Sequence, residues 1–491
     1  MDHERAERGL RLLCERALRR ASGCLDVTAG EHRDHEGFIR PPPLAAPPSA
    51  ETVIRDSLAG VQDVADAVSA VGAIDEELAD AILAGLSQAL IVRSRTISGT
   101  LARDVYRPTR GHREKAAQTG GGPADLRVAP IGRLVQVPAE GMPSDLYLMA
   151  AVVMPGMTTL TMIMHTRHSA DPAADLAADP FGQPGALLDR FTAIDDQGSG
   201  YELYFTGSHG PEEWNGFLNL RPAPGTGVRW LELFADGTGA LTRIDVAASP
   251  PPAEVVAEPH LIPPGERLLA RVAERLLVGG GDGPPPPAIE NLGEIVTLLH
   301  EVGALSRHSP LPGHLAALSE CLGRGDHGIA VDAVPDVPQP WADVLGIYDG
   351  KGRPLIRPGT RPPAGTLTAV ATVAVTLPEI DGVRFAVAGL HAGWNRNILY
   401  VVATGLPVPG RGVPVRSGLD MGFSWWLRDS AGRWHLAVPG RYEAGASGET
   451  RLNLSILPPL GPETGDVELL ITGRSARVRA RLTLRWWILP L

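Results

Sequence analysis

The chain has 491 residues, which suits two to four domains that each bury a core rather than one compact domain. Its formal net charge of -11 argues against a nucleic-acid-binding protein, because phosphates require a basic surface. The 3 cysteines (Cys14, Cys24 and Cys321) form no CxxC or CxxH spacing, so neither a disulfide framework nor a zinc site is indicated. No apolar run reaches the length of a signal peptide or a membrane span, and we therefore expect a cytoplasmic protein without membrane association.

An amphipathic docking helix is predicted over residues 1–22, followed by a proline-rich linker over residues 23–51. Leu10, Leu13 and Leu18 lie on one stripe at helical spacing, with arginines around the rest of the helix. Proline blocks helix continuation, so the linker is expected to be extended and semi-rigid. The helix can therefore dock at a distance, on the helices of its own half or on those of the other half.

An antiparallel helical hairpin is predicted over residues 52–94. Apolar residues recur at intervals of three and four on both sides of Gly72, which stands where a left-handed residue ends a helix. Asp75 is expected to cap the second helix of the hairpin.

Short alternating strands over residues 128–248 predict a first β-sandwich. Six of the 8 methionines lie in this block, from Met142 to Met164, and His165 follows them. Soft thioethers on one strand face suit Cu(I), and flexible methionines also suit an adaptable contact surface. Ordinary core packing is the favoured interpretation.

The second half repeats this order. A second docking helix is predicted over residues 264–278, a Gly/Pro linker over 279–288, a second helical hairpin over 289–323 and a second β-sandwich over 366–488. Gly303 takes the place of Gly72, and Ser309 is expected to cap the second helix of this hairpin. Four elements that recur in order indicate a tandem duplication.

Matching motifs lie inside the two strand blocks. Asp195, Gly198 and Tyr201 correspond to Asp429, Gly432 and Trp434, and a Leu-Asn-Leu strand followed by two prolines occurs later in each block. An Asp-Gly turn before an aromatic strand, and then a strand that ends in prolines, resembles the immunoglobulin-like sandwiches of uncharacterised actinobacterial proteins. The resemblance implies an immunoglobulin-like fold for each strand block and a binding role. Together with the duplication, it leads us to expect an α+β protein of two tandem repeats. Each repeat would have an N-terminal helix, a helical hairpin and an immunoglobulin-like antiparallel β-sandwich.

Two groups of residues are candidates for a partner surface. The first is the one strongly basic segment, which suits an acidic partner although a solvated loop explains it as well; its arginines are Arg103, Arg107, Arg110 and Arg113. The second is a tryptophan-rich region, which suits a protein or a sugar although core packing is the plainer interpretation; it contains Trp394, Trp425 and Trp426. Because Trp425 and Trp426 are adjacent in a strand, they point to opposite faces, and at most one is expected in the core.

A charged strand face is predicted near the end of the chain. Arg477, Arg479 and Arg481 alternate with apolar residues, so the three arginines share one face. Charge of this kind protects an edge strand from aggregation, and we expect the strand to lie at an edge.

No catalytic, cofactor-binding or metal-ligating residue is assigned, because the sequence contains no nucleophile elbow, phosphate loop, dinucleotide fingerprint or helical zinc motif. His391, His435 and Asp429 would support a hydrolase if they converged in one pocket. His32 and His35 have a spacing that metal ligands can have, but a solvated linker explains them better.

The predicted function is therefore a non-enzymatic protein–protein interaction or regulatory scaffold, with another protein as partner and no cofactor. Two tethered helices and the faces and edges of two sandwiches offer docking surfaces. The alternatives are a small-ligand or carbohydrate-binding module that uses the tryptophans, and a hydrolase with an unfamiliar site.

Overall fold

The computed structural model describes residues 3–31, 50–98, 126–137, 144–166, 191–209, 213–225, 227–235, 239–250, 253–279, 287–325, 327–329, 337–348, 368–393, 397–406, 417–445 and 448–489. The chain forms a helical unit (Met1–Ala117, Ile262–Leu355 and Pro409–Asp420) and a strand unit (Gln118–Leu261, Ile356–Val408 and Met421–Leu491). It is therefore a mixed α and β protein, as the sequence predicts. Among the described residues, no helix has both the length and the apolar character needed to cross a bilayer.

The helical unit contains two groups of helices that are separate in the sequence. They are α1 (His3–Glu31), α2 (Ala50–Ala70), α3 (Glu76–Ser98), α7 (Pro264–Gly279), α8 (Pro287–Glu290), α9 (Leu292–Glu301), α10 (Leu311–Cys321) and α11 (Gln339–Leu345). The first docking helix, α1, continues past Ser22, the end that the sequence pattern predicts.

Left-handed glycines follow the first helix of each hairpin, as predicted. Gly72 follows α2 with a φ of 67°, and Gly303 follows α9 with a φ of 75°, a conformation that glycine adopts at little cost. Asp75 caps α3, because its Oδ1 accepts a hydrogen bond from the Glu77 amide at 2.7 Å. The prediction for Ser309 is wrong. Pro310 already has helical angles and takes the cap position of α10, so no side chain caps that helix.

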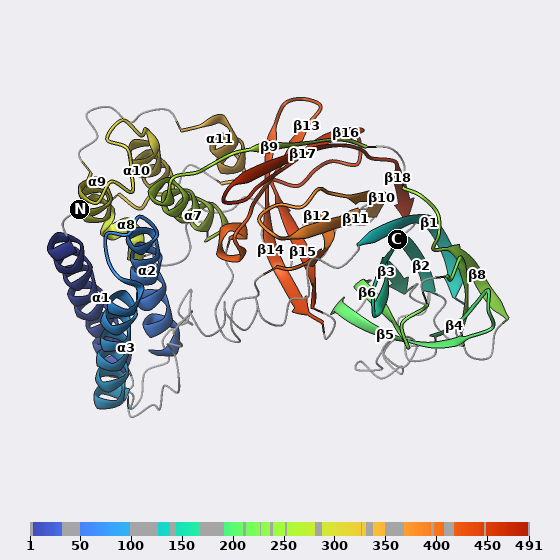
Figure 1. Ribbon diagram of the computed structural model, residues 1–491, viewed down its shortest axis with the longest axis horizontal. Coiled ribbons are helices and arrows are strands. Elements are labelled where there is room, and N and C mark those ends of the chain that lie inside the picture. The colour runs from blue at the N-terminus through green and yellow to red at the C-terminus, as the bar shows by residue number, and fades with distance from the viewer. Residues whose placement is uncertain are drawn as a thin grey trace, which may run out of the picture. The chain divides into compact units, whose positions relative to one another are not determined.

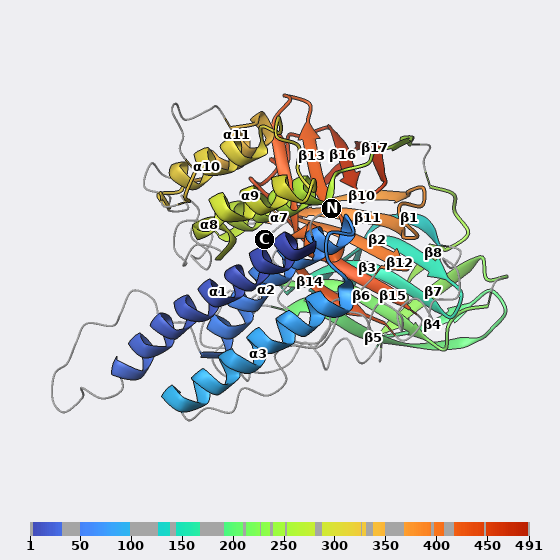
Figure 2. The same cartoon turned by 60° about the vertical axis from the view of Figure 1, so that its left-hand side comes forward.

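Each docking helix contacts helices of both halves. α1 runs along α2 and α3 (Figures 1 and 2), and its Leu10, Leu13 and Ala17 are buried. It also meets α9, where a Cβ added at Gly9 would lie 2.7 Å from Leu298 Cδ1. α7 packs on α10 of its own half and on α2 of the other half. The helices of the two halves therefore form one body.

A buried ion-pair network, the Asp63 network, joins α2 to α7. Asp63 accepts hydrogen bonds from Arg271 and Arg275 at 2.6 Å each, and Arg275 also donates to Asp420 at 2.5 Å. Burial by itself raises the pKa of Asp63, but Arg275 and Arg271 outweigh it, so the pKa lies below its ordinary value. The network thus holds a charged carboxylate inside the helical unit.

The first sheet of the strand unit is antiparallel and has the order β1-β2-β3-β6-β5-β4-β7-β8. Its strands are β1 (Arg127–Val137), β2 (Ser144–Met154), β3 (Met157–Thr166), β4 (Phe191–Asp195), β5 (Gly200–His209), β6 (Glu213–Arg221), β7 (Trp230–Ala235) and β8 (Ala240–Asp245). The sheet curls, and its first and last strands come together where Arg133 donates to Thr242 Oγ1 at 2.8 Å and to the Arg243 carbonyl at 2.9 Å. Apolar side chains from all of these strands fill the enclosed core.

The second sheet has the order β18-β10-β11-β12-β15-β14-β13-β16-β17-β9. Its strands are β9 (Glu254–Pro259), β10 (Thr368–Thr376), β11 (Arg384–Ala392), β12 (Asn397–Thr404), β13 (Ser424–Asp429), β14 (Trp434–Ala444), β15 (Glu449–Leu457), β16 (Asp466–Thr472), β17 (Ala476–Thr483) and β18 (Trp486–Leu489). All of its pairs are antiparallel.

The predicted edge position of the arginine-bearing strand is wrong, because β9 lies outside β17. Two of its arginines, Arg477 and Arg479, form ion pairs with Glu258 of β9. Arg481 lies 3.5 Å from Glu254. The charged face therefore joins two strands instead of guarding an edge.

Strands β10–β17 repeat the spatial order of β1–β8. The first strand of each block also contains a register shift, at which Gly132 has a φ of 55° and Ala374 a φ of 52°. Each block forms one continuous sheet. This differs from the immunoglobulin-like arrangement, in which two separate sheets face each other.

The two sheets pack against each other through β1, β2, β3 and β6 of the first and β10, β11, β12 and β18 of the second. Within this layer the rings of Phe217 and Tyr400 meet edge to face, with their centroids 6.0 Å apart. Met149 belongs to this layer, whereas Met162 and Met164 belong to the core of the curled sheet. These methionines pack in the core, as the favoured interpretation predicts.

Candidate functional site

In the structure, the three polar residues that suggested a hydrolase do not form one group. His435 Nε2 lies 3.6 Å from Asp429 Oδ2, and Asp429 also accepts a hydrogen bond from the Arg433 amide at 2.9 Å. His391 Nε2 instead lies 3.5 Å from Glu213 Oε2 of the first sheet. The three side chains therefore do not converge in one pocket, as the hydrolase hypothesis requires.

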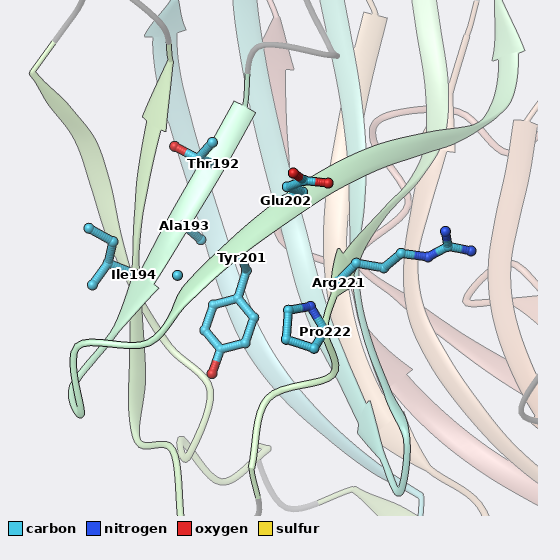
Figure 3. A pocket seen from close by; sticks show the side chains of 8 residues that line it. Thr192, Ala193, Ile194, Tyr201, Glu202, Arg221 and Pro222 are labelled. Carbon is cyan, nitrogen blue, oxygen red and sulfur yellow. The ribbon is translucent and has the colours of Figure 1, made fainter.

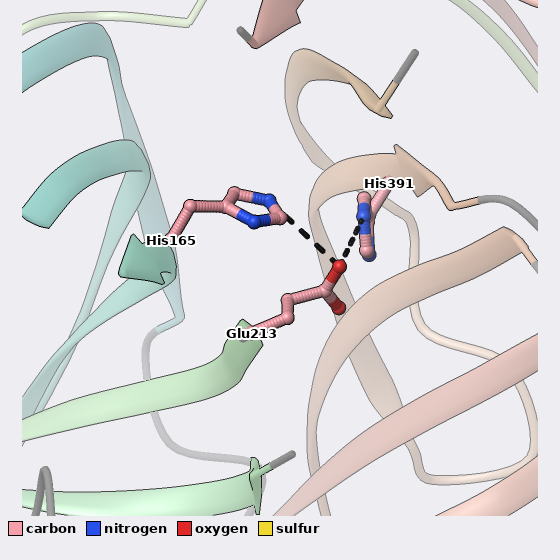
Figure 4. Close-up of side chains that lie close together, drawn as sticks. All are labelled: His165, Glu213 and His391. Carbon is pink, nitrogen blue, oxygen red and sulfur yellow. Dashed lines mark ion pairs between the residues drawn. The ribbon is translucent and has the colours of Figure 1, made fainter. Parts of the chain in front are cut away.

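His391 belongs to a different group, the histidine–glutamate cluster, which lies between the two sheets. It consists of His165 in β3, Glu213 at the start of β6 and His391 in β11. Figure 4 shows the Glu213 carboxylate between the two imidazole rings. His165 Nε2 lies 3.7 Å from Glu213 Oε2, and one possible ligand atom of each residue lies within 4.8 Å of those of the other two.

Strand register places these side chains. His165 and Glu213 are directly opposite each other in the β3–β6 ladder, and Ile163, two residues before His165, packs in the layer between the sheets. His391 is opposite Ile398 of β12, which packs in the same layer. Because residues opposite each other in a ladder share a face, all three side chains enter this layer.

The cluster is largely shielded from solvent and one of its groups is oriented. The side chains of His165 and His391 are 6% and 1% exposed, and that of Glu213 is 26% exposed. Asn215, on the same face of β6, donates its Nδ2–H to Glu213 Oε1 at 2.9 Å. The other carboxylate oxygen thereby faces the imidazoles. Such a set forms ion pairs when an imidazole is protonated, and it offers metal ligands when the imidazoles are neutral.

A second polar group, the arginine cluster, lies in the same layer. Arg451 in β15 donates to Asn219 Oδ1 at 2.5 Å and to Thr206 Oγ1 at 3.0 Å, both in the first sheet. Its guanidinium also lies 3.3 Å from Glu449 Oε1, and both charged residues are buried. This cluster holds the two sheets together with a permanent cation.

Both candidate tryptophans of the described chain are buried. Trp425 is 2% and Trp426 8% exposed, so the expectation that at most one lies in the core is wrong. The Trp425 ring packs edge to face on Phe385, with the ring centroids 4.9 Å apart, and the Trp426 ring packs in the same way on Trp434, with the centroids 6.4 Å apart. Both indoles are buried because side chains cover both faces of β13. The remaining candidates lie outside the described residues: Arg103, Arg107, Arg110, Arg113, Trp394 and the linker pair His32 and His35.

An open hollow of about 490 Å³ lies over β4 and β5 (Figure 3). Two of the polar side chains that line it make local contacts. The Arg221 guanidinium stacks on the Tyr204 ring at 4.8 Å, and the Tyr201 hydroxyl donates to Asp195 at 2.5 Å. Burial and this hydrogen bond to Asp195 raise the pKa of Tyr201 to about 12. The phenol and the guanidinium therefore serve the fold of this region.

Among the described strands, the two at the edges of the second sheet, β9 and β18, present apolar side chains to solvent. Val256 in β9 is 50% exposed, and Leu261, just beyond β9, is 79% exposed. At the other edge, Trp487 and Ile488 of β18 are 52% and 55% exposed. Exposed apolar residues beside an open strand edge are typical of protein-binding surfaces.

Sequence reasoning identified neither Glu213 nor the strand β9 as important. The signal for Glu213 is the alternation of Glu213, Asn215 and Asn219 with the apolar residues of β6, which places polar groups on one face of a buried strand. Comparisons with protein-family models, curated proteins and solved structures find no match to this chain.

Proposed function

We propose that this chain is a non-enzymatic protein–protein interaction protein that acts as a scaffold or regulator. The observation that carries the proposal is the outer edge of β9, the last strand of the second sheet in the described part of the chain. An extended segment of another protein can add to such an edge through main-chain hydrogen bonds. The interaction would extend the ten-stranded sheet by one strand.

The chemistry of β9 specifies what the partner segment offers. Glu254 and Glu258 are in ion pairs with arginines of β17, whereas Val256 between them is half exposed. A partner strand would therefore place an apolar side chain beside Val256 and polar side chains on either side. Leu261 extends the apolar contact beyond the end of the strand.

A tandem duplication is part of the proposal. The shared strand order of β1–β8 and β10–β17 supports it, and so do the left-handed glycines of the two helical hairpins. An immunoglobulin-like origin of the strand blocks is not included, because each block forms one continuous sheet. Among the described strands, β9 and β18 are additional strands of the second sheet without counterparts in the first, so the interaction edge distinguishes the two copies.

Site-specific photo-crosslinking tests the proposal. A photo-reactive residue at position 256 is expected to capture a protein from a lysate of the source cells. The matched control carries the same residue at Ile194, which is 42% exposed but lies in β4, a strand paired on both sides. Excess unlabelled protein should compete for the captured partner, and the Val256→Lys variant should not. Equal capture at both positions, or equal competition by the variant, would contradict the proposal.

A further inference from the structure

We propose that His165, Glu213 and His391 form a binding site for one divalent transition-metal ion, with zinc as the reference ion. The site lies in the layer between the two sheets, away from the edge strand β9 in the strand order. It is independent of the interaction proposed above. The inference depends on the separation, the chemistry and the fixed orientation of the three side chains.

The separation of the ligand atoms is close to what such an ion requires. Zinc bonds of about 2.0–2.1 Å in tetrahedral geometry place neighbouring ligand atoms roughly 3.4 Å apart. His165 Nε2 and His391 Nε2 lie 3.7 Å and 3.5 Å from Glu213 Oε2, and one possible ligand atom of each residue lies within 4.8 Å of those of the other two. Small side-chain rotations toward the centre of the cluster therefore suffice to coordinate an ion.

The ligand types select the class of metal. Calcium and magnesium take oxygen ligands, whereas two imidazoles and a carboxylate suit zinc, iron(II) and related ions. Copper(I) prefers soft sulfur ligands such as the methionine thioethers. Met162 and Met164 pack in the core of the curled sheet, on the face of β3 opposite to His165.

The surroundings hold the ligands in place. Each comes from a strand within a sheet, and the two histidines are almost fully buried. Asn215 donates a hydrogen bond to Glu213 Oε1, and Oε2 lies beside the two imidazoles, which is the arrangement by which outer groups orient metal ligands. Rigid, oriented ligands reduce the ordering that metal binding requires.

The site has two physical consequences. With three protein ligands, a tetrahedral ion keeps one position for water or another small ligand, which can approach from the partly exposed side of Glu213. The ion also links β3 and β6 of the first sheet to β11 of the second. Metal binding should therefore stabilise the strand unit against unfolding.

Metal titration of the full chain tests the site. The protein is freed of metal with a chelator, dialysed and titrated with zinc by calorimetry and with cobalt(II) by visible absorption. We expect one equivalent of each ion to bind, cobalt to give the absorption bands of a four- or five-coordinate site, and zinc to raise the melting temperature. Absence of stoichiometric binding would overturn the proposal.

Two variants and one control locate the ion. Glu213→Gln keeps the size of the side chain and its contact with Asn215, and His391→Asn removes an imidazole. Each should weaken zinc binding by more than tenfold, while Asn215→Ala should weaken it by about 10–100-fold. His435→Asn is the matched control, because His435 is also a buried histidine beside a carboxylate and lies outside the cluster.

Circular dichroism of the metal-free proteins separates loss of the site from loss of the fold. If His391→Asn does not fold, Glu213→Gln carries the test. Unchanged zinc affinity in a folded Glu213→Gln or His391→Asn variant would overturn the assignment, as would a loss of affinity in His435→Asn equal to theirs.

Discussion

The two polar clusters lie in the same layer between the sheets but differ in their chemistry. Both the arginine cluster and the histidine–glutamate cluster join a strand of the first sheet to one of the second. Arg451 carries a permanent charge and meets Glu449, Asn219 and Thr206. Imidazoles are charged only when they bind a proton, and they ligate metals only when neutral. The first cluster is therefore fixed in its state, whereas the second responds to protons and metal ions.

The difference explains how each cluster can be buried. Removing a charge from water costs several kcal/mol unless partners replace the lost hydration. The two terminal nitrogens of Arg451 have acceptors in both sheets, whereas its buried Nε has none among the described residues, so most of the cost of burial is compensated inside the protein. In the histidine–glutamate cluster the described ion pairs of Glu213 are with imidazoles, and their strength depends on what the imidazoles bind.

The largest expected effect is at the arginine cluster. Arg451→Met leaves the Glu449 carboxylate buried without this guanidinium, and we expect the free energy of unfolding to fall by about 3–5 kcal/mol. Urea denaturation measures it. The double variant Arg451→Met with Glu449→Gln should recover part of this loss, because it removes the buried negative charge as well. If the double variant loses as much unfolding free energy as Arg451→Met, lost packing and not the buried charge is responsible.

The second-largest expected effect is the stabilisation of the strand unit by zinc. At a free zinc concentration 100 times the dissociation constant, stability should rise by about 2.7 kcal/mol. The gain should shrink as the pH is lowered from 7.5 to 5.5, because protons compete with the metal for the imidazoles. Thermal melting with and without zinc at several pH values measures this, and a gain independent of pH would contradict histidine ligation.

The helical unit contains a comparable buried ion-pair group, the Asp63 network, whose cations are arginines as in the arginine cluster. The pKa of Asp63 is lowered in the folded protein, so its contribution is present above the unfolded value of about 3.9 and is lost as the pH falls toward the folded value. Asp63→Asn should cost about 1.5–3 kcal/mol at neutral pH and flatten the acid side of the stability profile. Denaturation between pH 7 and pH 3 measures both. Glu76→Gln, at an exposed carboxylate of α3, is the control, and its effect on the free energy of unfolding should be the smaller of the two.

The smallest effect is expected at the exposed ion pairs between β9 and β17. The side chains of Arg481 and Glu254 are each 70% exposed, so their charges are screened by water and salt. Arg481→Ala should change stability by about 0.2–1 kcal/mol, and less in high salt. A loss as large as that of Arg451→Met would remove the distinction between buried and exposed pairs.

Local patterns in the sequence predicted the elements well but not their long-range pairing. The helices on either side of Gly72 and Gly303, and the left-handed conformation of these two glycines, follow from spacing and turn residues, which act within a few residues. The position of β9 depends on register with β17, which is more than two hundred residues away in the sequence (Arg481 and Glu254 differ by 227). Alternation alone also could not show that side chains cover both faces of β13, where Trp425 and Trp426 are buried.

The candidate site shows the same limit. From the sequence, His391 is a candidate catalytic histidine whose predicted partners, His435 and Asp429, belong to the same strand block. They lie instead in the first sheet, on β3 and β6, and come together only because two sheets pack face to face. Packing between sheets is decided by the shape of whole apolar faces, and no local spacing records it.

Anomalous scattering at the zinc absorption edge, from crystals of the full chain grown with one equivalent of zinc, would locate the ion. We expect one strong peak between the sheets, about 2.0–2.2 Å from Nε2 of His165, Nε2 of His391 and a carboxylate oxygen of Glu213. A peak elsewhere, or none at this position, would contradict the proposed metal site and would leave the histidine–glutamate cluster as a set of ion pairs alone.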